Sequence, residues 1–136
     1  GIKLSDSKLE LPASQVGAHV MVVDDEAPLG RYWQDLLEGE GYRVSVFNDS
    51  RAALERFTAA PHEVDAVLSD VTMPHVSGEQ LAQAMLARRG DLPVFLLSGN
   101  LSAFDERGGA TPGVRQRFKK PVNSAEVLAA LSAALV

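Results

Sequence analysis

The sequence LSDVTMPHVSG, residues 68–78, decides the fold class. A strand-like apolar run leads directly into Asp70, and a proline-containing loop and a helix cap follow it. An unpaired carboxylate buried at the end of a strand costs several kcal/mol or is neutralised by protonation. Asp70 therefore needs partners from elsewhere in the chain.

Length, composition and charge exclude several classes of protein. The 136 residues suit one domain, and the absence of cysteine excludes disulfides and thiolate metal sites. No apolar run approaches the ~20 residues of a membrane-spanning helix, and no signal-peptide pattern opens the chain. A net charge of −5 opposes binding to phosphate backbones. We expect a cytoplasmic domain that contacts neither membrane nor nucleic acid.

Apolar strand-like runs alternate with helical patterns along most of the chain. The expected strands cover residues 19–23, 43–47, 65–69, 93–97 and 115–118, and the expected helices cover 29–39, 51–60, 78–88, 101–107 and 124–135. Ser77 with Gln80, and Asn123 with Glu126, have the spacing of capping boxes at helix starts. The first, third and fourth strand runs lack polar alternation, as in strands covered by helices on both faces. The pattern predicts a doubly wound parallel α/β sheet.

Polar side chains follow four of the expected strands. They are Asp24 and Asp25 after the first strand, Asp70 after the third, Ser98 after the fourth and Lys120 after the fifth. Ligands of open parallel sheets bind beyond the carboxyl ends of the strands, so these groups are expected to meet there. Two carboxylates ~4 Å apart repel by roughly 4 kcal/mol at an effective dielectric of 20, which favours a bound cation.

The residue types at this edge favour phosphoryl chemistry. Mg²⁺ binds one or two protein carboxylates together with phosphate oxygens. An aspartate carboxylate can attack phosphorus to give an acyl phosphate, and Asp70 is the central candidate. Lys120 and Mg²⁺ would balance the charge of the transferring group, while Ser98 would donate a hydrogen bond to it. Each residue alone has an ordinary structural explanation, so the prediction depends on their occurrence together.

The chain resembles the receiver domain of two-component response regulators over residues 18–136. The residues that carry the resemblance are Asp24-Asp25, DVTMP at 70–74 with Gly78, Ser98-Gly99 and Lys120-Pro121. The resemblance implies a flavodoxin-like (βα)5 fold with strand order 2-1-3-4-5. It also implies that Asp70 accepts a phosphoryl group from a histidine kinase or a histidine phosphotransfer domain, in a phosphorelay with self-catalysed transfer and dephosphorylation.

The same resemblance implies a ligand set for Mg²⁺. Asp25 and Asp70 would bind the ion directly, together with the backbone carbonyl of Thr72, and Asp24 would act through a water molecule. One position departs from the family, because receivers usually carry Tyr or Phe three residues before the active-site lysine, and Arg117 stands there. Phe118 is expected on the opposite face of the sheet. We expect Arg117 to stay at the surface and the domain to act mainly as a phosphoryl relay.

Two alternative functions stay open at this point. One is a receiver-like docking module that is never phosphorylated, and the other is a Mg²⁺-dependent aspartyl phosphatase, although Thr72 stands where such enzymes carry a second acid. Residues 1–17 read as a linker or expression remnant. The stretch SKLELPAS, residues 7–14, also resembles the end of a histidine-kinase domain. A hybrid sensor kinase is therefore the preferred parent protein, and a stand-alone regulator is the alternative.

Overall fold

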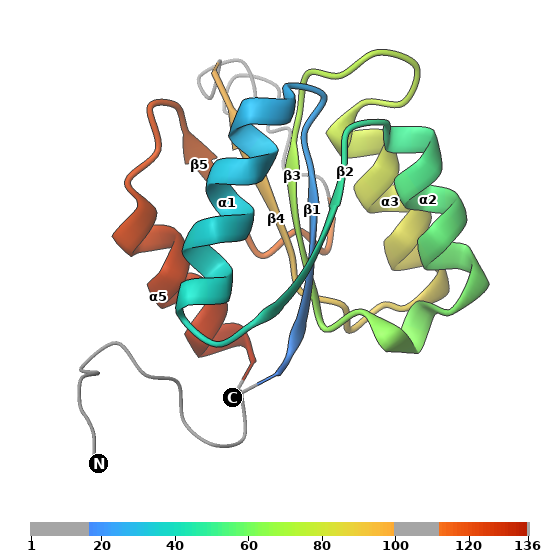
Figure 1. Cartoon of the computed structure of the whole chain (residues 1–136). Coiled ribbons are helices and arrows are strands. Elements are labelled where there is room, and N and C mark those ends of the chain that lie inside the picture. The colour runs from blue at the N-terminus through green and yellow to red at the C-terminus, as the bar shows by residue number, and fades with distance from the viewer. Residues whose placement is uncertain (1–16, 100–111, 136) are drawn as a thin grey trace.

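A five-stranded parallel sheet forms the centre of the protein. The structure is a computed structural model and describes residues 17–99 and 112–135, so the predicted linker falls almost entirely outside it. The strands are β1 His19–Val23, β2 Arg43–Phe47, β3 Ala66–Asp70, β4 Val94–Ser98 and β5 Gln116–Lys119. Their order is β2-β1-β3-β4-β5 (Figure 1). This order and the parallel pairing confirm the predicted flavodoxin-like fold.

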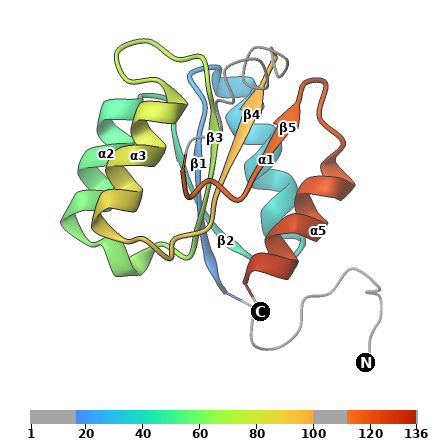
Figure 2. The same cartoon turned by 180° about the vertical axis from the view of Figure 1, so that it is seen from behind.

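Helices cover both faces of the sheet. They are α1 Ala27–Gly39, α2 Ser50–Ala59, α3 Gly78–Arg88 and α5 Ser124–Ala134, with a short 3-10 helix at Pro61–Glu63. Figures 1 and 2 show α1 and α5 on one face and α2 and α3 on the other. The helix predicted at 101–107 lies outside the described residues. Within the described part of the chain, every helix is too short or too polar to cross a bilayer.

The alternation of strand side chains produces two separate hydrophobic cores. In β1, Met21 and Val23 pack on the side of α2 and α3, whereas Val20 and Val22 pack on the side of α1 and α5. All residues of β1, β3 and β4 are buried, which confirms the prediction of strands covered on both faces. The polar residues at the ends of these strands are therefore held on a rigid support.

Side-chain caps define where α3 and α5 begin. The predicted capping box of α3 is present, because Ser77 Oγ accepts from the Gln80 N–H at 3.2 Å and Gln80 Oε1 accepts from the Ser77 N–H at 3.0 Å. Asn123 caps α5 with its side-chain oxygen accepting from the Ala125 N–H at 2.9 Å, but the predicted capping box with Glu126 does not form. Such caps contribute about 1 kcal/mol each.

Candidate functional site

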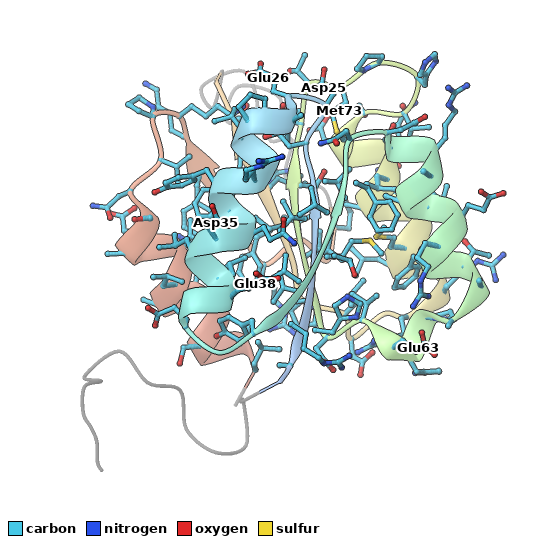
Figure 3. All side chains as sticks on the ribbon, in the orientation of Figure 1. Asp25, Glu26, Asp35, Glu38, Glu63 and Met73 are labelled. Carbon is cyan, nitrogen blue, oxygen red and sulfur yellow. The ribbon has the colours of Figure 1, made fainter. Side chains whose placement is uncertain are left out.

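Three carboxylates meet at the carboxyl edge of the sheet. Asp24 and Asp25 follow β1, Asp70 ends β3, and one ligand oxygen of each lies within 4.8 Å of the others. Asp24 and Asp70 are buried, whereas Asp25 is exposed. Figure 3 shows Asp25 and Glu26 at this edge, beside the loop that carries Met73. The cluster is therefore closed below by the sheet and open to solvent at Asp25.

Asp24 carries one oxygen that the protein does not satisfy. Its Oδ1 accepts from the Glu26 N–H at 2.9 Å, while its Oδ2 is buried without a hydrogen-bond partner among the described residues. Burial raises the pKa of Asp24; the Glu26 N–H opposes this, and the Asp70 charge raises the pKa further. A buried carboxylate oxygen without a partner, beside two further carboxylates, fits a divalent cation or one of its water ligands.

Lys120, directly after β5, contacts Asp70, the candidate phosphoacceptor. Its Nζ lies 2.9 Å from Asp70 Oδ1, which also accepts from the Val71 N–H at 3.0 Å. Burial alone would lower the pKa of Lys120, but the hydrogen bond and charge of Asp70, with the charges of Asp24 and Glu26, raise it above 10.5. Lys120 is therefore an ammonium at neutral pH, paired with Asp70.

Backbone contacts hold the remaining predicted residues at the same edge. Ser98 ends β4 and is buried, and its carbonyl accepts from the Lys120 N–H at 2.8 Å. Thr72 is exposed two residues beyond Asp70, in the loop between β3 and α3. The structure thus brings Asp24, Asp25, Asp70 and Lys120 into one cluster, with Ser98 beside it on the neighbouring strand end.

Asn48 belongs to this edge and was not predicted from the sequence. Asn48 Nδ2 donates to the Asp24 carbonyl at 2.8 Å and so fixes the turn that presents the acids. Its position directly after β2, at the same edge as the acids, is the sequence signal that points to it. His75 adopts φ 71° in the loop after Asp70, a conformation uncommon for residues other than glycine. Asp25, Asn48 and His75 border a cavity of about 160 Å³.

The prediction that Arg117 stays at the surface is wrong. Its side chain is only 11% exposed, and its Nη2 lies 3.9 Å from Glu79 Oε2 in the first turn of α3. The register pairs Arg117 with Leu96, whose side chain belongs to the face covered by α2 and α3. An opposite charge on α3 makes this burial tolerable. Phe118 packs on the other face, as predicted.

An apolar cavity of about 320 Å³ adjoins the acidic cluster. Its apolar lining comes from α1, β4 and the loop after β5, and comprises Leu29, Tyr32, Trp33, Leu97, Pro121 and Val122. Asp24 and Lys120 also border it, so the cavity reaches the site itself. Tyr32 is the exposed large hydrophobic residue of the described surface, at 49%.

At neutral pH without Mg²⁺, Asp24→Asn is expected to raise the free energy of unfolding by about 0.5–2 kcal/mol, the usual gain from a single stabilising substitution. Because the folded state raises the pKa of Asp24, the ionised form costs stability at neutral pH. The gain should shrink as the pH falls through that folded pKa. Urea unfolding at neutral and acidic pH measures it.

Stabilisation by added Mg²⁺ should fall in the same Asp24→Asn variant, since the buried oxygen that fits the ion or its water is gone. The Glu26 N–H keeps an acceptor, because an asparagine oxygen replaces Oδ1. A variant that is less stable than the parent at neutral pH without Mg²⁺ would contradict this account of Asp24.

Known proteins match both the sequence and the geometry. The chain is 32% identical over 117 residues to the uncharacterized transcriptional regulatory protein YkoG of Bacillus subtilis. The matched region covers 86% of this chain and 50% of that protein. A response regulator receiver domain protein from Clostridium thermocellum superposes with a TM-score of 0.79 at 26% identity, covering 87% of this chain and 94% of that one.

The chemotaxis protein CheY4 of Vibrio cholerae superposes with a TM-score of 0.77 at 26% identity, covering 88% of this chain and 99% of that one. The chain spans about half the length of YkoG and of other bacterial regulatory proteins that it matches. The family model of the response regulator receiver domain matches residues 20–132. The chain therefore belongs to the receiver domain family of two-component response regulators.

Proposed function

We propose that Asp70 is the phosphoacceptor of this receiver domain. The observation that carries the proposal is the 2.9 Å contact between Lys120 Nζ and Asp70 Oδ1 inside a cluster of three carboxylates. A carboxylate oxygen of Asp70 attacks the phosphorus of a phosphohistidine and forms an O–P bond. The P–N bond breaks, and its electron pair leaves with the imidazole, which is protonated from solvent.

The charged groups around Asp70 have distinct roles in this transfer. The Lys120 ammonium stabilises the negative charge as it shifts from the carboxylate to the phosphoryl oxygens. The Ser98 hydroxyl donates a hydrogen bond to one of these oxygens. Asp25, Asp70 and the Thr72 carbonyl would hold Mg²⁺ directly, and Asp24 through water. The bound ion would neutralise charge on the phosphoryl oxygens. The three-carboxylate cluster and the unsatisfied oxygen of Asp24 support this assignment.

The family match does not favour the two alternative functions. A docking module that is never phosphorylated would have no need for the acids and the paired lysine that this site retains. A phosphatase would need a second acid to protonate a leaving group, and Thr72 occupies the position two residues after Asp70. Location in the cytoplasm and a hybrid kinase as the parent protein stay predictions.

The proposal predicts that the domain gains one phosphoryl group from phosphoramidate in the presence of Mg²⁺. Intact-mass spectrometry measures the gain, and Asp70→Asn should abolish it because an amide is not a nucleophile at phosphorus. Asp91→Asn is the matched control, since Asp91 is exposed and pairs with Arg89 away from the cluster. Equal labelling of the Asp70→Asn variant and the parent would overturn the assignment.

Receiver domains of two-component systems interact with histidine kinases or phosphotransfer proteins. For this chain, we place the helix that carries the donor histidine over α1 and the loop after Lys120. The apolar cavity there opens beside Asp24 and Lys120, and the exposed Tyr32 enlarges its apolar rim. Apolar anchors surrounded by charge are typical of protein interfaces.

A Leu29→Glu substitution in this cavity is expected to slow transfer from a phosphohistidine protein by about tenfold, the effect of losing one interface anchor. Labelling by phosphoramidate should stay unchanged, because Leu29 is a partly exposed apolar residue that borders the cavity and supplies no group to the transfer. The comparison of the two donors is internally controlled. If both reactions slow equally, Leu29 has a structural role and the docking surface lies elsewhere.

A further inference from the structure

Two cations, one in the chain's last strand, β5, and one directly after it, contact two acids of the segment that runs from Asp70 into α3. Lys120 contacts Asp70 at 2.9 Å, and Arg117, three residues earlier, lies 3.9 Å from Glu79. The Arg117 and Glu79 side chains are 11% and 28% exposed, so solvent screens this pair far less than an ordinary surface pair. The pair therefore connects β5 to the first turn of α3.

The first turn of α3 is fixed relative to the backbone of Asp70. The Gly78 N–H donates to the Val71 carbonyl at 2.8 Å, and a Cβ at Gly78 would lie 2.2 Å from the Asp70 carbonyl oxygen. Glu79 follows directly, so its backbone is held in a fixed place beside the phosphoacceptor. A residue that contacts Glu79 is therefore held in a fixed position relative to the backbone of Asp70.

Resting on the proposed phosphoacceptor function, we infer that Arg117 is a positioning residue for Lys120. The Lys120 N–H bond to the Ser98 carbonyl fixes the end of β5 along β4, but a single strand neighbour leaves β5 at the edge of the sheet. The Arg117–Glu79 pair holds β5 to α3 across the face of the sheet. This second attachment sets how far Lys120 stands from Asp70 before and during transfer.

The charges of the pair also constrain what a single substitution does. Glu79→Gln removes the charge that attaches Arg117 to α3, and Arg117→Met removes the same attachment from the side of β5, so in either variant β5 would shift relative to α3. A displacement of a fraction of an ångström at a catalytic group costs about fivefold to tenfold in rate, since 1 Å costs about 10²-fold. The expected effect is therefore a slower transfer from a folded protein.

The test compares phosphoramidate labelling rates, at saturating donor and with Mg²⁺, for the parent protein, Arg117→Met and Glu79→Gln. Each single variant should be about fivefold to tenfold slower at saturation. The charge-swapped double variant, Arg117→Glu with Glu79→Arg, should recover most of the rate. Glu63→Gln is the matched control: it loses the ion pair with Arg56, and Glu63 lies at the opposite end of the molecule from Asp25 (Figure 3).

A second measurement needs no phosphorylation. In the parent protein the Lys120 ammonium should give a slowly exchanging ¹⁵N–¹H signal, which should broaden in both single variants and return in the double variant. Single variants that label at the parent rate and retain the signal would overturn the positioning role, as would a double variant as slow as the singles. If phosphoramidate fails to phosphorylate the parent protein while the ammonium signal changes across the variants as expected, only the phosphoacceptor proposal is overturned.

Discussion

Gly78→Ala is expected to lower the free energy of unfolding by about 3 kcal/mol or more, because overpacking against a rigid partner is costly. An added Cβ would lie 2.2 Å from the Asp70 carbonyl oxygen and 2.8 Å from the Val71 Cα. Both are backbone atoms, so no side chain can rotate away. The start of α3 would have to move from β3 and lose the 2.8 Å bond from the Gly78 N–H to the Val71 carbonyl.

Urea unfolding of Gly78→Ala measures this loss, and Gly39→Ala supplies a control with the same chemical change. Gly39 is in the last turn of α1, where an added Cβ would meet no atom within 4 Å. Higher helix propensity should therefore stabilise that variant by up to about 1 kcal/mol. A Gly78→Ala variant within about 1 kcal/mol of the parent would show that α3 can move freely and that the Glu79 backbone is not fixed beside Asp70.

The elements that could be predicted from sequence are those that local chemistry specifies. Continuous apolar runs predicted β1, β3 and β4, since both faces of these strands are buried. The spacing of Ser77 and Gln80 predicted the start of α3 to the residue, because both capping bonds are local. The acids could be predicted in the same way, since Asp24 and Asp25 come directly after β1 and Asp70 is the last residue of β3.

Arg117 could not be predicted because its surroundings are set by long-range contacts. Its residue type favours solvent, but β5 register turns the side chain toward the face under α3, and Glu79 comes from a segment 38 positions earlier in the chain. Neither fact is visible in the local sequence around Arg117, RQRFKK at residues 115–120. The position of Asn48 directly after β2 can be read from the sequence, but its role cannot, because its amide binds the Asp24 backbone rather than a ligand.

Lys120→Met is expected to slow phosphoramidate labelling of Asp70 by about 10²-fold or more, the usual cost of removing one preorganised charge donor at a transferring group. The ammonium is well placed for this role, at 2.9 Å from Asp70 Oδ1 and only partly exposed, where its charge is weakly screened. Methionine retains the length and the apolar contacts of the side chain. The loss therefore reports the charge itself.

The same variant separates catalysis from metal binding. Without the ammonium, Asp24, Asp25 and Asp70 lose a neighbouring positive charge, so their mutual repulsion rises and Mg²⁺ should bind at least as tightly as in the parent. Lys119→Met, at the exposed neighbouring position on β5, is the matched control and should leave both properties unchanged. Calorimetric Mg²⁺ titration and intact-mass labelling give the two readings on one sample. Slow labelling with weaker Mg²⁺ binding would mean that Lys120 supports the metal site rather than the transferring group.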